Sequence, residues 1–150
     1  MSNKASTQNL GPWELFIFCY RNAFNFSGRS SRSEFWYFFL FYHLILLGTG
    51  VVCGVLFSLS EFFLYVYLVG VGVFMLISLI PALSVSVRRM HDIGYSGFWM
   101  IAIALLSALA GIDTSGLLAL IFLIVFIVVF TRPSEAHDNK YGSFNQIGNN

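Results

Sequence analysis

Apolar residues follow one another along most of this chain in runs long enough to cross a lipid bilayer. Residues 35–59 and 62–87 contain no formally charged side chain, and the polar pair Ser60-Glu61 separates them. At about 1.5 Å of rise per residue, each run makes a helix of roughly 37–39 Å, which exceeds the about 30 Å of hydrocarbon in a bilayer. The pattern therefore predicts two transmembrane helices joined by a tight turn.

The second half of the chain contains two shorter apolar runs, and two interpretations of them stay open. The polar segment Asp113-Thr114-Ser115 separates the runs, which reach residues 96–112 and 116–131 when neighbouring uncharged residues are included. Each run is short for a complete span. The pair forms either two short spans or a re-entrant hairpin that enters from one face. A single long span is disfavoured, because it would place Asp113 near the middle of the membrane.

The segment before the first span predicts an amphipathic helix over residues 12–27. Pro12 suits the first turn of a helix, and aromatic and aliphatic residues then recur at helical spacing. This segment is too short to span, so we expect it to lie in the membrane interface. The other segments are a flexible N-terminus (1–11), a four-span membrane domain (28–131) and a polar cytoplasmic tail (132–150). The predicted fold class is an all-α integral membrane protein, a four-helix transmembrane bundle with an N-terminal interfacial amphipathic helix.

The basic residues predict the orientation. The loops around Glu61 and Asp113 contain no Lys or Arg. Because positive residues remain on the cytoplasmic side, we expect both termini and the central loop to be cytoplasmic. All eight basic residues lie in these three segments: Lys4, Arg21, Arg29, Arg32, Arg88, Arg89, Arg132 and Lys140.

Composition supports the membrane class and excludes several functions. Hydrophobic residues make up 57% and charged residues 10% of the chain, against roughly 45–50% and about 25% in globular proteins. The net charge of +1 gives no electrostatic basis for binding nucleic acid. No metal-ligand spacing, nucleophile elbow or phosphate-binding loop is present, so we expect no catalytic residue, metal or cofactor, and no enzyme. Cys19 and Cys53 fall on opposite sides of the membrane and should not form a disulfide.

The loop of residues 88–97 is the densest polar segment, and it has two interpretations. In the structural one, Asp92 pairs with Arg88 at i+4, Gly94 turns the chain and Ser96 caps the next helix. In the functional one, the loop binds an anionic headgroup or a partner's carboxylate, with His91 as a titrating member. Across the cytoplasmic face, the candidate polar cluster consists of Arg29, Arg32, Glu34, Arg88, Arg89, His91, Asp92, Lys140 and Tyr141.

Glu34 lies at the membrane boundary, where an unpaired carboxylate is costly. Ser31 and Glu34 fit a capping box at the start of the first span. We further expect Glu34 and Asp92 to form ion pairs with arginines of the cytoplasmic loops, because charge-assisted bonds to Arg are strong. The candidate partners are Arg32, Arg88 and Arg89.

His43 is the ionisable residue well inside a predicted span, about 13 Å from Glu34 by helical rise. Ser78 and Ser107 lie at a similar depth on other spans, and Pro81 frees the carbonyl of Ile77 near that level. We expect a neutral His43 that hydrogen bonds to such groups. The alternative is a role in proton relay.

Three blocks of the sequence resemble the domain of unknown function 805 family. The first runs from Phe26-Ser27-Gly28-Arg29 to Glu34-Phe35-Trp36, the second is Arg88-Arg89-Met90-His91-Asp92-Ile93-Gly94 through Ser96-Gly97-Phe98-Trp99, and the third is Asn139-Lys140-Tyr141-Gly142. The resemblance covers residues 13–142 and implies a small four-span protein of the bacterial cytoplasmic (inner) membrane. The family has no established activity. Ser31 and Tyr95 replace frequent basic residues, which lowers the positive charge of the cluster.

The sequence thus favours a multi-pass inner-membrane protein of unknown biochemical activity. We expect its cytoplasmic face to bind an anionic phospholipid headgroup or another membrane protein, with the lipid bilayer as its general partner. The alternative is a small transporter or channel subunit with His43 and Pro81 near a pore. Transport ranks second because Ser, Thr and Gly form only a thin polar stripe along the spans.

Overall fold

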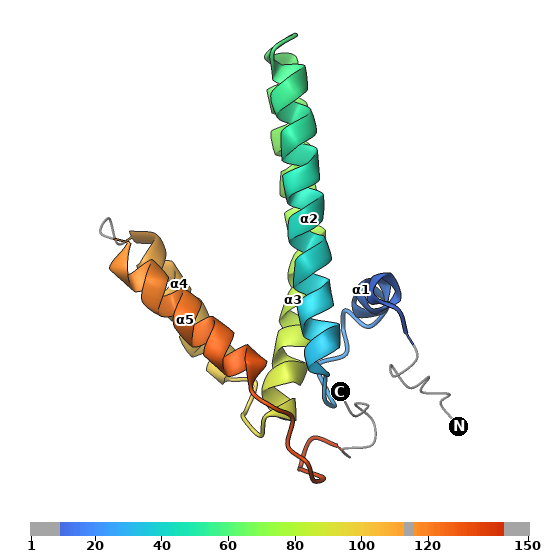
Figure 1. Ribbon diagram of the computed structural model, residues 1–150, viewed down its shortest axis with the longest axis vertical. Helices are drawn as coiled ribbons and strands as arrows, with labels where there is room; N and C mark the ends of the chain where they lie inside the picture. The colour runs from blue at the N-terminus through green and yellow to red at the C-terminus, as the bar shows by residue number, and fades with distance from the viewer. Residues whose placement is uncertain (1–9, 113–115, 143–150) are drawn as a thin grey trace.

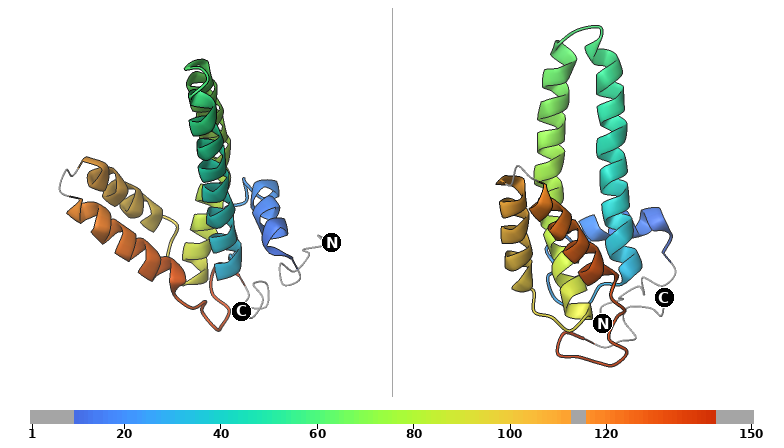
Figure 2. Two further views of the ribbon diagram at one scale, coloured as in Figure 1. Left: turned by 45° about the horizontal axis from the view of Figure 1, so that its top comes forward. Right: turned by 60° about the vertical axis from the view of Figure 1, so that its left-hand side comes forward.

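The computed structural model describes residues 10–112 and 116–142, and within them the chain is all-α. Two helical hairpins, α2–α3 and α4–α5, diverge from a common base, and α1 lies beside that base (Figures 1 and 2). The described helices are α1 (Pro12–Arg21), α2 (Arg32–Phe57), α3 (Phe62–Asp92), α4 (Trp99–Ile112) and α5 (Leu117–Thr131).

Helices α2 and α3 have the length and surface expected of membrane spans. They contain 26 and 31 residues, or about 39 Å and 47 Å of helix. Large apolar side chains remain exposed along them, for example Leu47 at 66%, Val69 at 67% and Leu76 at 72%. Both are long and apolar enough to cross a membrane, by length and composition. Such exposure is costly in water and favourable in lipid, so these surfaces fit a bilayer.

The ends of the long helices differ from the prediction. Helix α2 begins at Arg32 and ends at Phe57 rather than covering 35–59, and α3 continues to Asp92 rather than ending at 87. The end of each apolar run in the sequence indicates where the chain leaves the hydrocarbon of a bilayer. Backbone hydrogen bonds continue the helix beyond that level. The polar residues 88–92 therefore lie on the last turn of a helix, not in a loop.

Helices α4 and α5 form a shorter hairpin. They contain 14 and 15 residues, or about 21 Å and 22 Å of helix. The helices begin at Trp99 and Leu117 rather than at residues 96 and 116. Gly116 precedes α5 with φ of 74°, a conformation that suits glycine. Both interpretations of the apolar runs, two short spans or a re-entrant hairpin, contain this hairpin; Asp113 lies outside the described residues.

The predicted four-helix bundle is wrong, because the two hairpins pack only near their base. There Phe35 stacks on Phe130 with ring centroids 4.3 Å apart, and Phe126 contacts Trp36 and Phe39. Above these aromatic contacts the hairpins separate (Figure 1). Apolar helix faces gain little free energy by exchanging lipid contacts for contacts with one another. Helices therefore pack only where closely fitting side chains make favourable van der Waals contacts.

Helix α1 is shorter than the predicted 12–27 and buries its apolar face against protein. It ends at Arg21, where the Asn22 side chain donates to the carbonyl of Phe18. The helix crosses α2 and α3 near the base (Figure 2). Phe16 stacks on Phe38 at 5.7 Å. The expected amphipathic face is therefore present, and part of it packs on α2.

Candidate functional site

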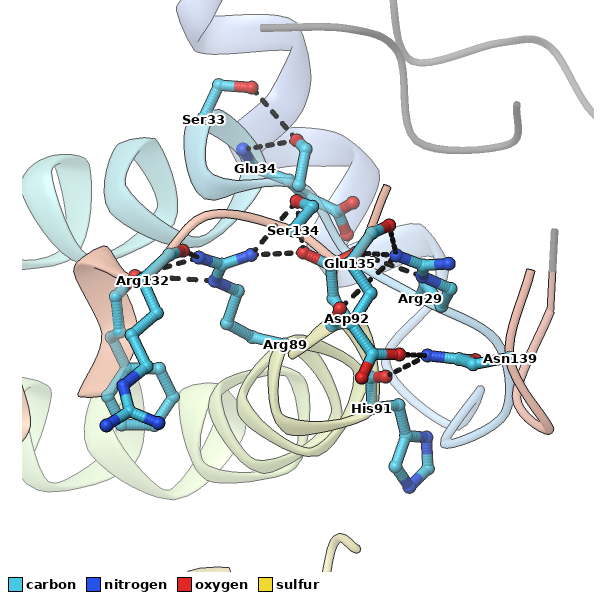
Figure 3. A network of polar contacts seen from close by, with 12 residues as sticks. Arg29, Ser33, Glu34, Arg89, His91, Asp92, Arg132, Ser134, Glu135 and Asn139 are labelled. Atoms are coloured by element: carbon cyan, nitrogen blue, oxygen red, sulfur yellow. Dashed lines mark hydrogen bonds and ion pairs between the residues drawn. The ribbon is translucent and has the colours of Figure 1, made fainter. Parts of the chain in front are cut away.

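A polar layer joins all segments of the chain where the hairpins meet. We call it the polar base; it comprises Arg29, Ser30, Glu34, Arg88, Arg89, His91, Asp92 and the tail residues 132–142. Figure 3 shows its part around Asp92. Its buried arginines come from the loop after α1 and from the C-terminal end of α3, and its buried carboxylates from α2 and α3. Arg89, Glu34 and Asp92 are at most 2% exposed.

Asp92 is the centre of the larger half of this layer (Figure 3). Its Oδ1 lies 3.0 Å from Nη2 of Arg29, while its Oδ2 accepts from Nη1 of Arg89 and from the Ser134 hydroxyl. Both ion pairs have side chains that are fully buried. Isolated buried charges would be very unfavourable, so the pairing is a condition of burying this layer.

Backbone carbonyls satisfy the guanidinium groups further. Arg29 donates to the carbonyls of Glu135 (2.7 Å) and His137 (2.9 Å). Arg89 donates to the carbonyls of Phe130 (3.3 and 3.2 Å) and Arg132. The last carbonyls of a helix have no partner within the helix, and they carry the negative end of its dipole. Arg89 on α3 therefore caps the C-terminal end of α5.

A third buried ion pair joins α2 to α3. Nη1 of Arg88 lies 2.6 Å from Oε1 of Glu34, and the side chains are 4% and 2% exposed. The Ser30 amide donates to the Arg88 carbonyl at 3.1 Å. Burial raises the pKa of the neighbouring Cys19 thiol, and the negative charge of Glu34 raises it further. Such a thiol stays protonated and inert at neutral pH, and Cys19 and Cys53 are both free.

The described part of the tail packs on the end of α3. Asn139 Nδ2 donates to the carbonyl of His91 (3.0 Å) and to Oε2 of Glu135 (2.7 Å). The His91 ring stacks on Tyr141 with centroids 3.8 Å apart, and Nζ of Lys140 lies 5.0 Å from the Tyr141 centroid. The predicted cluster members His91, Lys140 and Tyr141 are thus neighbours.

The predicted ion pairs are partly confirmed. Glu34 pairs with Arg88, and Asp92 pairs with Arg89, as expected. The predicted i+4 pair of Asp92 with Arg88 is wrong, because Arg88 points to α2 and Asp92 binds Arg29 instead. Arg32 is the first residue of α2 and partly buried.

The local capping predictions are also partly confirmed. Ser31 Oγ accepts from the Glu34 amide at 3.1 Å, which is half of the predicted capping box. The Glu34 carboxylate belongs to the ion pair with Arg88. Gly94 turns the chain with φ of 81°, as expected. Ser96 lies three residues before α4, and its hydroxyl accepts from the Phe98 amide at 3.4 Å.

The hydrogen-bond partners expected for His43 are wrong, while its structural role stays a prediction. Its Nδ1 lies 2.7 Å from the carbonyl of Phe39 on the same helix, and its side chain is exposed. Ser78 bonds to the Tyr20 hydroxyl at 2.7 Å, and Ser107 donates to the carbonyl of Ala104. These polar groups stay apart because the Ser78 hydroxyl bonds to Tyr20 of α1 and because α4 diverges from α2.

An apolar groove runs between α4 and α5 and opens at the polar base. Its volume is about 350 Å³, and its walls include Trp99, Ala102 and Leu106 of α4 and Val125 and Val129 of α5. At its polar end, Nη1 of Arg132 lies 3.0 Å from the Tyr95 hydroxyl, and the guanidinium carbon lies 5.9 Å from the Tyr95 ring centroid. We call this feature the α4–α5 groove; Arg132 was not among the predicted site residues.

Several other contributors to the polar base were missed from the sequence. Ser134, Glu135 and Asn139 follow the last apolar run in a segment without periodicity. The resemblance block that begins at Asn139 was a signal for Asn139, and no pattern pointed to Ser134 or Glu135. Among the described residues there is no group of three or more His, Cys, Asp or Glu side chains that could hold a metal ion.

Long apolar helices with lipid-compatible surfaces, joined to a polar base, are typical of a helical membrane protein. The chain belongs to the family described as "Protein of unknown function (DUF805)", which it matches over residues 23–143. It is 26% identical over 145 residues to "Inner membrane protein YhaI" of Escherichia coli (strain K12), which covers 92% of this chain and 98% of that protein. The protein of the same name in Escherichia coli O157:H7 gives the same values. No solved structure matches the chain.

These comparisons confirm the family resemblance read from the three blocks. The match from residue 23 to residue 143 includes both long helices, the α4–α5 hairpin and the described tail. The chain is therefore an inner membrane protein of unknown function, with two long candidate spans and two shorter apolar helices.

Proposed function

We propose that this protein binds anionic phospholipids at its polar base, that the base faces the cytoplasm, and that the protein catalyses no reaction. The orientation rests on charge. The described basic residues all lie on α1 or in the polar base and its surroundings, while Glu61 lies at the far tip of the α2–α3 hairpin. The positive-inside rule places the basic end in the cytoplasm.

The observation that carries the proposal is the environment of Arg132. The buried arginines 29, 88 and 89 are engaged inside the polar base with Asp92 and Glu34. The Arg132 side chain is exposed, and its guanidinium hydrogen bonds to the neutral Tyr95 hydroxyl. A guanidinium at the end of an apolar helix lies where lipid phosphates lie, and its fork geometry matches a phosphate group.

The internal pairing also explains why the buried charges are not themselves the binding site. Asp92 and Glu34 lie directly against these arginines, at distances that leave no room for an anion between them. In the part of the chain that the structure describes, the hydrogen bond of the His43 ring stays within α2, so no observation favours the pore alternative. Surface attraction of a basic residue to anionic lipid contributes about 1 kcal/mol, so we expect a preference and not an irreversible association.

Native mass spectrometry of the full-length chain tests this function. The detergent-purified protein is mixed with equal amounts of phosphatidylglycerol and phosphatidylcholine that carry the same acyl chains, and the bound lipids are counted. We expect bound phosphatidylglycerol to exceed bound phosphatidylcholine. Arg132→Gln should lower that ratio about five-fold, which corresponds to about 1 kcal/mol.

Arg21→Gln is the matched control. Arg21 is also an exposed cation at the end of a helix, but it lies on α1, away from Arg132. The control variant should bind phosphatidylglycerol and phosphatidylcholine in the same ratio as the unaltered protein. Equal binding of the two lipids by the unaltered protein would refute the proposal, and so would an equal loss in both variants.

A further inference from the structure

We propose that the α4–α5 groove is an acyl-chain site, so that the protein holds one phospholipid molecule with its phosphate on Arg132 and one acyl chain between α4 and α5. This inference rests on the proposed function, because it uses the same cation. It adds that the ligand is recognised by its hydrocarbon as well as by its charge.

The shape and chemistry of the groove fit an acyl chain. Its volume of about 350 Å³ lies within the roughly 300–1,000 Å³ of ligand pockets. The α4 and α5 residues in its walls are apolar, and among them Ala102 has the smallest side chain. A buried hydrocarbon chain has no polar atom to satisfy, so these walls suit it.

The polar groups of the groove lie at one end, as an amphipathic ligand requires. Arg132 and Tyr95 line the groove at the end where α4 and α5 meet the polar base. The Tyr95 ring also contacts Trp99 edge to face, with centroids 6.2 Å apart. Tyrosine, tryptophan and arginine together favour the interfacial level of a bilayer. A phospholipid placed with its phosphate at Arg132 would therefore direct its chain away from the base along the groove.

The backbone holds the mouth of the groove in place. The Tyr95 amide donates to the Met90 carbonyl at 2.9 Å, which continues the α3 end into the turn. A Cβ atom added at Gly97 would come within 2.8 Å of Cγ1 of Val87, so glycine allows the start of α4 to approach α3 closely. On the opposite side, the backbone carbonyl of Arg132 accepts from the buried guanidinium of Arg89. Both walls are thus anchored to the polar base before a ligand arrives.

Quenching of Trp99 fluorescence by a brominated lipid tests the site, since Trp99 lines the groove. Trp13→Phe and Trp36→Phe leave Trp99 as the single tryptophan of the full-length chain. The probe is phosphatidylglycerol brominated near the glycerol end of one acyl chain, titrated in detergent; brominated phosphatidylcholine is the reference. We expect saturable quenching, at about five-fold lower concentration for phosphatidylglycerol. Glycerol phosphate, which has the charge without the chain, should not displace the lipid.

Two variants separate the groove from the headgroup site. Ala102→Phe fills the groove and should raise the half-saturating lipid concentration at least ten-fold, while Ala104→Phe, exposed on the same helix and outside the groove lining, should not change it. Non-saturable quenching, or identical titrations for both variants, would overturn the acyl-chain site while the lipid ratio in mass spectrometry still supports headgroup binding. Loss of that ratio in the unaltered protein would overturn both proposals.

Discussion

Arg89 shows how a single side chain connects parts of the chain that are distant in sequence. Its guanidinium is fully buried, pairs with Asp92 on the same helix and donates to carbonyls at the end of α5. Burying this charge is favourable only because the surrounding groups supply both the counter-charge and the acceptors. Removing the side chain would take one charged partner from Asp92 and uncap α5.

Arg89→Ala should therefore destabilise the protein by about 3–5 kcal/mol, the usual result of removing one partner of a buried ion pair. The measurement is chemical unfolding in detergent without added lipid, followed by the helical circular dichroism signal. Arg132→Ala removes the same charge from an exposed position and should cost less than about 1 kcal/mol. Equal losses would mean that the buried network contributes nothing beyond its net charge.

At the scale of elements, the turn between α3 and α4 determines how the two hairpins join. Gly94 has a φ of 81°, and a Cβ atom added there would overlap the carboxylate of Glu135 in the tail. Residues with side chains rarely adopt this conformation, so glycine satisfies both the turn and the close approach of the tail.

Gly94→Ala should destabilise the protein by about 1–3 kcal/mol, the range for a strained backbone position. Thermal unfolding in detergent measures the loss. Gly70→Ala is the control, because Gly70 lies inside α3 with open space around it and should gain up to about 1 kcal/mol of stability. Equal stability of the two variants would mean that a side chain at residue 94 does not strain the turn.

The long elements could be predicted from the sequence, and most of the contacts between them could not. Uninterrupted apolar runs predicted α2 and α3, and the cost of a boundary carboxylate predicted a partner for Glu34. The helix ends were misplaced because hydropathy reports the membrane boundary and not the last backbone hydrogen bond. The role of Ser134 depends on a contact with Asp92, 42 residues away, which no local pattern encodes.

At the scale of the whole molecule, two apolar hairpins diverge from one polar base (Figure 1). Their exposed apolar sides fit a hydrocarbon solvent, whereas the described basic residues gather at one end. This asymmetry gives the protein a direction in the membrane. The proposed lipid site lies where the two regions meet. In the proposed orientation the polar base faces the cytoplasm and the tip around Ser60 faces the opposite side.

Labelling of single cysteines in intact cells with a membrane-impermeant maleimide tests that orientation in the full-length chain. Cys19 and Cys53 are buried, so introduced cysteines at exposed positions supply the signal. Ser60→Cys, at the tip of the α2–α3 hairpin, should react in intact cells. Lys140→Cys, at the polar base, should react only after the inner membrane is permeabilised. The reverse result, with Lys140→Cys labelled in intact cells and Ser60→Cys protected, would contradict the orientation and with it the cytoplasmic lipid site.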